Sequence, residues 1–190
     1  MGRENKPEWI IVHHTGGTDI NPLADTSNHT FDIVNEWHKK LWNFKSKFGY
    51  YIGYHYFIDK RGVVYHGRDD LEEGAHCRGM NTRSIGIAMA GNFDRPPYMS
   101  NSYPSKEQIE ALKLLLIKLS DKYKIPFRRI VPHRFFAVKT CYGKNLSDWW
   151  ASNLVVKEVS RRKISILQKM VVIYTKILAI LRKIKDKREA

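Results

Sequence analysis

A pair of adjacent histidines, a third histidine and a cysteine lie where a folded chain could use some of them as metal ligands. His13 and His14 follow the apolar run Trp9–Val12 and precede a Gly-Gly pair, so they lie where a predicted strand opens into a loop. His133 and Cys141 are eight residues apart on another predicted loop. Two imidazoles and one thiolate can hold Zn²⁺ and leave the fourth tetrahedral position to water, which is the arrangement of catalytic zinc sites. The sequence has no CxxC pair, so a four-cysteine structural site is not expected.

The same residue types also have ordinary structural uses. A single histidine is often a hydrogen-bonded structural residue, and a single cysteine is often a small buried hydrophobe. Spacing alone therefore leaves both open: a catalytic metal site, and unrelated structural roles for the three residues.

The elements that must position these residues alternate between strand and helix patterns. Ser105 and Gln108 form a capping box, which predicts a helix that ends before Pro126. Ser147 is the expected cap of a short helix carrying Trp149 and Trp150. The remaining predicted segments are strands at 9–12, 84–90 and 129–131, a hairpin of 54–59 with 63–65, and a helix at 31–43. This order predicts an α/β fold with a mixed central sheet flanked by helices.

The charge is concentrated in the last fifth of the chain. The sequence has 33 Lys+Arg and 19 Asp+Glu, a net charge of +14, and residues 154–190 alone have a net charge of +8. We expect two parts, a domain of residues 1–153 and a cationic amphipathic C-terminal helix of residues 154–190. Its apolar stripe recurs at spacings of three and four: Ile164, Leu167, Met170, Val171, Tyr174, Ile177, Leu178, Leu181 and Ile184.

Three partners remain open for that helix. It could pack on its own domain, pair with a second copy, or lie through residues 155–187 on an anionic membrane surface with its basic residues at the headgroups. Its basic residues lie mostly off the stripe: Lys163, Lys169, Lys176, Arg182, Lys183 and Lys187. Its longest uncharged run, residues 170–175, is far shorter than the roughly 20 residues that span a bilayer.

Five short motifs occur in an order that resembles a known enzyme family. They are Val12-His13-His14-Thr15, Gly53-Tyr54-His55-Tyr56, the run 74–81 (GAHCRGMN), the run 84–87 (SIGI), and His133 with Cys141 eight residues later. Together they are similar to the type-2 N-acetylmuramoyl-L-alanine amidases, a family that includes T7-type phage lysozymes and animal peptidoglycan recognition proteins. The resemblance covers about residues 9–150.

The resemblance implies one Zn²⁺ per chain, held by His13, His133 and Cys141. It also implies that Tyr54 and Lys139 are catalytic, as hydrogen-bond donors to the oxyanion of the tetrahedral intermediate. The lysine two residues before the last ligand is typical of the phage branch. At the position after Cys141 the family usually has proline, whereas this chain has Tyr142, which predicts a less restricted loop.

Further histidines near these motifs have less defined roles. His14, His76 and Asn81 are candidates for lining a substrate groove. One of His14, His55 and His76 could instead hydrogen-bond a ligand imidazole. Each is as readily explained as a structural residue, and Cys77 is expected to be a free thiol without a role.

The predicted function is hydrolysis of the lactyl–L-alanine amide of bacterial peptidoglycan by a phage or prophage endolysin, a bacteriolytic and hence antimicrobial activity. The N-terminus has no apolar signal segment, so we expect synthesis in the cytoplasm and action on the cell wall after release. The alternative is a non-catalytic peptidoglycan-binding module, which Cys141 disfavours because such relatives typically lack that ligand. No nucleic-acid partner is expected, because the basic charge comes without a nucleic-acid-binding motif.

Overall fold

A five-stranded mixed sheet forms the centre of the fold. The computed structural model describes residues 3–188, and side chains as far as residue 177. The strand order is β3-β2-β4-β1-β5, and only the β2–β3 hairpin is antiparallel. The predicted mixed sheet is thereby confirmed. The strands are β1 (Trp9–His14), β2 (Tyr56–Ile58), β3 (Val64–His66), β4 (Ser84–Met89) and β5 (Ile130–Pro132).

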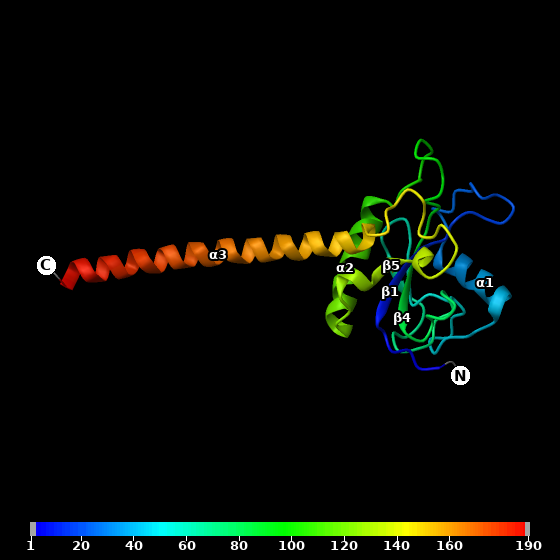
Figure 1. The fold of residues 1–190 in the computed structure, drawn as a ribbon, viewed down its shortest axis with the longest axis horizontal. Helices are drawn as coiled ribbons and strands as arrows, with labels where there is room; N and C mark the ends of the chain where they lie inside the picture. The colour runs from blue at the N-terminus through cyan, green and yellow to red at the C-terminus, as the bar shows by residue number, and fades with distance from the viewer. Residues whose placement is uncertain (1–2, 189–190) are drawn as a thin grey trace. The chain divides into compact units, whose positions relative to one another are not determined.

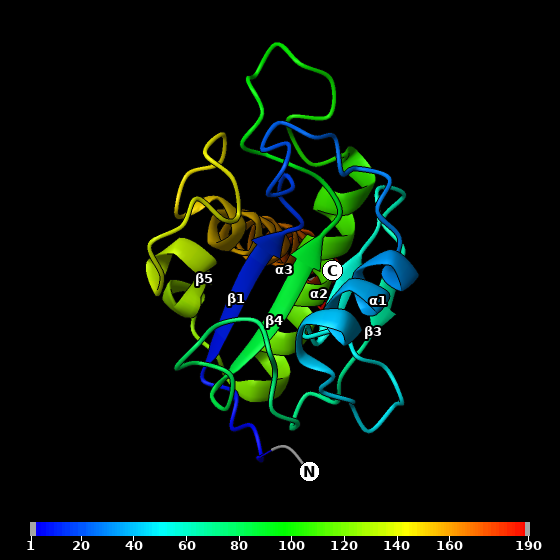
Figure 2. The same cartoon turned by 90° about the vertical axis from the view of Figure 1, so that its right-hand side faces the viewer.

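Two helices lie on opposite faces of this sheet, α1 (Phe31–Trp42) and α2 (Lys106–Tyr123), as Figures 1 and 2 show together. The Thr30 side chain caps α1 by accepting a hydrogen bond from the backbone N–H of Ile33. The predicted capping box of Ser105 and Gln108 is present at the start of α2. Two short 3₁₀ turns, η1 (Phe127–Arg129) and η2 (His133–Phe135), flank β5.

Apolar side chains pack each helix onto the sheet. Phe31 and Val34 of α1 form a buried cluster with Phe57 and Ala88 of the strands. Helix α2 buries its leucine face, Leu112, Leu115, Leu116 and Leu119. Burial of a leucine side chain contributes about 2 kcal/mol, so these two faces account for much of the fold's cohesion.

The register of β1 sets the position of the candidate ligands. Strand β5 runs parallel to β1, with Val12 opposite Pro132. The next residue on each strand is a histidine, His13 on β1 and His133 directly after β5. Because the carboxyl ends of parallel strands meet at the same edge of a sheet, the two imidazoles emerge side by side although 120 residues separate them.

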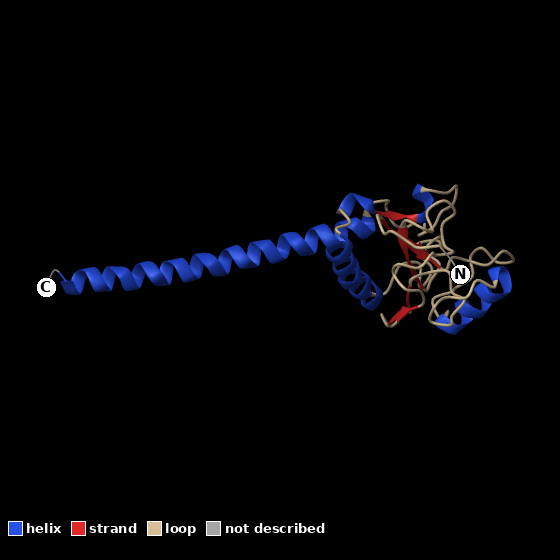
Figure 3. Cartoon of the chain, turned by 90° about the horizontal axis from the view of Figure 1, so that it is seen from below, coloured by secondary structure: helices blue, strands red, loops and turns tan. Residues whose placement is uncertain are grey.

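The C-terminal helix differs from the prediction. A single helix α3 (Trp150–Arg188) replaces the expected short helix and separate terminal helix, and it is continuous in Figure 3. No glycine or proline interrupts residues 150–188, which explains the continuity. At its start, the Ser147 backbone carbonyl accepts a hydrogen bond from the Trp150 N–H.

The chain divides into two compact units, Met1–Asn153 and Leu154–Ala190. Every side chain from Ser160 to Ile177 is exposed. The predicted stripe residues Leu178, Leu181 and Ile184, and the basic residues Arg182, Lys183 and Lys187, have side chains outside the described part. Among the residues that the structure describes, no helix is long and apolar enough to cross a bilayer.

Candidate metal centre

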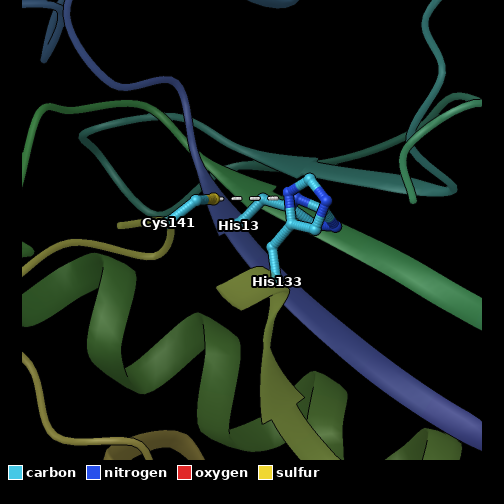
Figure 4. Close-up of side chains that lie close together, drawn as sticks. All are labelled: His13, His133 and Cys141. Carbon is cyan, nitrogen blue, oxygen red and sulfur yellow. Dashed lines mark hydrogen bonds between the residues drawn. The ribbon is translucent and has the colours of Figure 1, made fainter. Parts of the chain in front are cut away.

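His13, His133 and Cys141 converge at the carboxyl edge of the sheet. One ligand atom from each lies within 4.8 Å of the other two. His13 comes from the end of β1, His133 from the start of η2, and Cys141 from the loop that follows η2 (Figure 4). The two imidazole ring centres are 4.6 Å apart, and His13 Nδ1 lies 3.7 Å from Cys141 Sγ.

This donor set fits Zn²⁺ in chemistry and in spacing. Zn²⁺ prefers imidazole nitrogen and thiolate sulfur, at about 2.0 Å and 2.3 Å respectively. In a tetrahedral site those bond lengths separate a nitrogen donor from a sulfur donor by about 3.5 Å. The separation of 3.7 Å between His13 Nδ1 and Cys141 Sγ is close to that value.

Burial keeps the candidate ligands uncharged in the absence of metal. It lowers the pKa of His13 well below its usual value, with smaller contributions from His76 and His133. Burial, followed by the Lys139 ammonium, lowers the pKa of His133 to about 4. Burial also raises the pKa of the Cys141 thiol to about 12. Both imidazoles therefore offer a lone pair at neutral pH, whereas the thiol must release its proton to bind a metal.

His76 supports His13 from the side away from Cys141. Its Nδ1 lies 3.1 Å from His13 Nε2, and its Nε2 lies 3.5 Å from the hydroxyl of Ser84. Glycines flank the ring of His76: a Cβ atom at Gly74 or at Gly86 would come within 2.5 Å of it. The imidazole therefore fits against the backbone only because Gly74 and Gly86 have no side chains.

The loop that carries Cys141 is tied to the residues around it. Arg134, next to His133, donates hydrogen bonds to the backbone carbonyls of Gly143 and Leu146, at 2.8 and 2.6 Å. The Arg134 backbone N–H also donates to the Cys141 carbonyl, at 2.8 Å. These bonds fix the spacing between the candidate ligands His133 and Cys141.

Tyr142 anchors the same loop, where the sequence predicted less restriction. Its side chain is completely buried, and its hydroxyl lies 2.9 Å from the Ser147 carbonyl and 3.0 Å from the Asp148 carbonyl. Asp94 adds a further tie, because its carboxylate accepts a hydrogen bond from the Lys144 N–H at 2.7 Å. A buried aromatic ring therefore restrains this loop in place of the proline that the family usually has.

The two predicted catalytic side chains both border the same cavity. The ring of Tyr54 packs 5.0 Å from that of His13, centre to centre. Burial, and secondarily the Cys141 sulfur, raises the pKa of Tyr54 above its ordinary value, so the phenol keeps its proton. Lys139 is exposed on the loop before Cys141.

The candidate substrate residues are engaged in structural contacts as well. His14 is buried, and its Nδ1 accepts a hydrogen bond from the Phe93 N–H at 3.0 Å. The Asn81 side-chain oxygen accepts the backbone N–H groups of His76 and Cys77, at 3.0 and 2.9 Å. Cys77 is a buried free thiol.

His55 packs against His76, with ring centres 5.6 Å apart. Among the described residues, no hydrogen bond joins its side chain to a candidate ligand. Its Nδ1 accepts the Gly86 N–H at 3.0 Å, and its Nε2 lies 2.9 Å from the Glu72 carbonyl. Of the three histidines considered as supports for a ligand, His76 is the one in contact with His13.

A cavity of about 1180 Å³ opens over the three candidate ligands. Helix α1 supplies one wall through Trp37, Leu41 and Trp42, which are about half exposed. His14, His76 and Asn81 contribute to its lining, as do Arg3 and Arg78. The site therefore combines a potential metal centre with an open groove that has aromatic and basic walls.

Comparisons with known proteins show which sequences and folds this chain resembles. The family model for N-acetylmuramoyl-L-alanine amidase matches residues 3–144. The endolysin of Enterobacteria phage T3 is 34% identical over 151 residues, covering 78% of this chain and 89% of the relative. The solved N-acetylmuramoyl-L-alanine amidase LysC from Clostridium intestinale has a TM-score of 0.58 at 31% identity, covering 74% of this chain and 79% of LysC. The crystal structure of Drosophila peptidoglycan recognition protein SD has a TM-score of 0.58 at 25% identity, covering 76% of this chain and 79% of that one.

Proposed function

The chain belongs to the N-acetylmuramoyl-L-alanine amidase family, and we propose that it is a zinc-dependent hydrolase of the lactyl–L-alanine amide in bacterial peptidoglycan. The observation that carries the proposal is the convergence of His13, His133 and Cys141 within 4.8 Å under an open cavity. Three ligands beside an open groove are what a catalytic zinc site requires, because one coordination position must stay free.

Each polar side chain at the groove has a role that follows from its surroundings. Zn²⁺ held by His13, His133 and Cys141 would supply Lewis acidity to the amide carbonyl. Tyr54 keeps its proton and donates a hydrogen bond to the carbonyl oxygen as negative charge develops there. Lys139 is exposed at the rim of the same cavity, where its ammonium group also stabilises the negative charge on that oxygen.

His76 acts by fixing the tautomer of His13. If His13 Nδ1 faces the metal together with Cys141 Sγ, the proton of the neutral ring must lie on Nε2. That proton is donated to His76 Nδ1, and the Nε2 proton of His76 then points to the Ser84 hydroxyl. Ser84 in turn donates to the Met80 carbonyl at 2.7 Å. Every group in this chain of bonds is neutral, which suits a buried support for a metal ligand.

The groove walls suit a glycopeptide. The half-exposed rings of Trp37 and Trp42 offer apolar faces to sugar rings, and the exposed Arg78 offers positive charge to peptide carboxylates. Similarity to phage endolysins supports the further proposal that the protein is made in the cytoplasm of an infected bacterium and acts on the wall after release.

The test compares two cysteine variants. Cys141→Ser should lower the release of free amino groups from purified peptidoglycan by at least about a thousandfold and should lose zinc from the folded protein. Cys77→Ser, which changes the other buried thiol, should keep one zinc per chain and near-normal release. Unchanged release by Cys141→Ser would refute the zinc assignment.

A non-catalytic peptidoglycan-binding module is the second candidate, and similarity to the peptidoglycan recognition proteins favours it. It predicts that the wild-type protein co-sediments with purified walls and releases no amino groups. The same assay therefore separates the two functions, because only the hydrolase gives release that depends on Cys141.

A further inference from the structure

The outer part of α3 exposes an apolar face that the proposed hydrolase does not use. Nine large apolar side chains between Ile164 and Ile177 are each 47–61% exposed. At about 100° per residue, all of them except Val172 fall on roughly one half of the helix circumference. We call this surface the α3 apolar face; its members are Ile164, Ile166, Leu167, Met170, Val171, Ile173, Tyr174 and Ile177.

Basic residues border the α3 apolar face, and no acidic residue accompanies them. Arg162, Lys169 and Lys176 recur every seven residues along one edge of the face. Between Glu158 and Asp186 the sequence contains no aspartate or glutamate. Glu158 binds Arg161 and Arg162, at 3.1 and 3.0 Å. An occupant of this surface must therefore bring negative charge of its own, together with an apolar interior.

A second copy of the helix does not fit this surface. A two-stranded coiled coil buries two rows of side chains, whereas the α3 apolar face has four. The outer rows, such as Ile164 with Val171, would stay in water. The flanking Lys169 and Lys176 would also find no carboxylate between residues 159 and 177 of the partner helix. Width and charge both count against self-pairing.

We propose that the α3 apolar face lies on the surface of a bilayer that contains anionic phospholipid. The apolar side chains would enter the boundary between headgroups and acyl chains, while Lys169 and Lys176 would stay at the phosphates. Lys163 is the one basic residue within the face, near its N-terminal end, and its aliphatic stem can reach the headgroups from there. The helix lies along the membrane, consistent with the lack of a bilayer-spanning helix among the described residues.

The experiment is co-sedimentation of the full-length protein with vesicles. One preparation is phosphatidylcholine alone, and the other contains about one third phosphatidylglycerol. We expect binding to the anionic vesicles only, and weakening as salt is added. Ile166→Ser with Ile173→Ser tests the face, and Lys169→Gln with Lys176→Gln tests the charge; each pair should weaken binding at least about tenfold. The matched control, Gln168→Ser with Thr175→Ser on the polar side, should bind as the wild type does.

Four results would overturn the proposal. Equal binding to neutral vesicles, or none to anionic ones, would exclude the anionic membrane. If Ile166→Ser with Ile173→Ser leaves binding to anionic vesicles unchanged, the basic residues alone are responsible for binding, as they would be for a nucleic acid. If the wild-type protein forms dimers without lipid, and Ile166→Ser with Ile173→Ser abolishes them, the α3 apolar face binds a second copy of the chain. Hydrolysis of purified wall should be unchanged in all these variants, so failure here is distinguishable from failure of the proposed hydrolase.

Discussion

The carboxyl edge of the sheet and the outer part of α3 place polar and apolar side chains in opposite ways. At the sheet edge, three histidines, His13, His76 and His133, are at most 8% exposed and are held by neighbours. Along α3, every side chain from Ser160 to Ile177 is exposed, including the α3 apolar face. The sheet edge is therefore specified by contacts within its own domain. The α3 surface is specified by local helical spacing, and in our proposal an outside partner covers it. Each prediction below tests that difference.

After loss of a candidate ligand, the largest expected effect is on catalysis, from Tyr54→Phe. Loss of the hydroxyl removes one hydrogen-bond donor to the developing oxyanion, which typically costs about 10²–10³-fold in rate. The ring contact with His13 would remain, so zinc content should not change. Initial rates on purified peptidoglycan, with zinc measured by mass spectrometry, check this. A normal rate would remove Tyr54 from the catalytic group.

The next effect concerns the support of His13. His76→Ala should weaken zinc binding about 10–100-fold in competition with a chelator, because the hydrogen-bond acceptor for His13 Nε2 is lost. His76→Asn places an oxygen near the former Nδ1 position and should restore part of the affinity. If the wild type, His76→Ala and His76→Asn all bind zinc with equal affinity, His76 serves only as a packing residue.

A smaller effect is expected on stability as the pH falls. Burial lowers the pKa values of His38 and His55 to about 4, against about 6.5 in an unfolded chain. The unfolded state then binds more protons between these two values. Stability should therefore be constant above about pH 6.5 and fall below it, by about 1–2 kcal/mol per histidine at pH 5.

Urea unfolding at pH 7 and pH 5 measures this loss. His38→Asn keeps an acceptor for the Gly53 N–H that now bonds to His38 Nδ1 at 2.8 Å, and it should show a shallower pH dependence. The same slope in both proteins would mean that other groups cause the acid sensitivity.

The smallest effect on hydrolysis is expected from removing residues 160–190. Since the described side chains of 160–177 are all exposed, hydrolysis of purified wall should change by less than about twofold. Binding to anionic vesicles should disappear in the same protein. A tenfold loss on purified wall would instead show that α3 contributes to the sheet-edge site, and the contrast between the two regions would fail.

Local sequence patterns correctly predicted the strands, helix caps and turns that are determined by neighbouring residues in the chain. The apolar run at Trp9, the capping box at Ser105 and the hairpin around Gly62 all lie where their patterns indicated. The join between the last two predicted helices was wrong, because Ser147 looks like a helix start although α3 begins at Trp150 and runs on without a break. A capping residue indicates where a helix can begin. It carries no information about where that helix ends.

The supporting residues of the site were harder to predict. Arg134 and Tyr142 act through backbone carbonyls of a loop, and no spacing rule signals such contacts. His76 was one of three equal candidates, because its contact with His13 joins segments 63 residues apart. The ligand candidates themselves were predicted through a family resemblance, since spacing alone left their roles open.

The close fit around His76 has a consequence for how this chain tolerates mutation. A single methyl group at Gly74 or Gly86 would come within 2.5 Å of the imidazole. Such a change alters no charge, no hydrogen-bonding side chain and no candidate ligand, yet it would tilt the ring on which His13 leans. A survey of inactive variants should therefore recover alanine at these two positions, and an observer without the structure would have no chemical reason to suspect either.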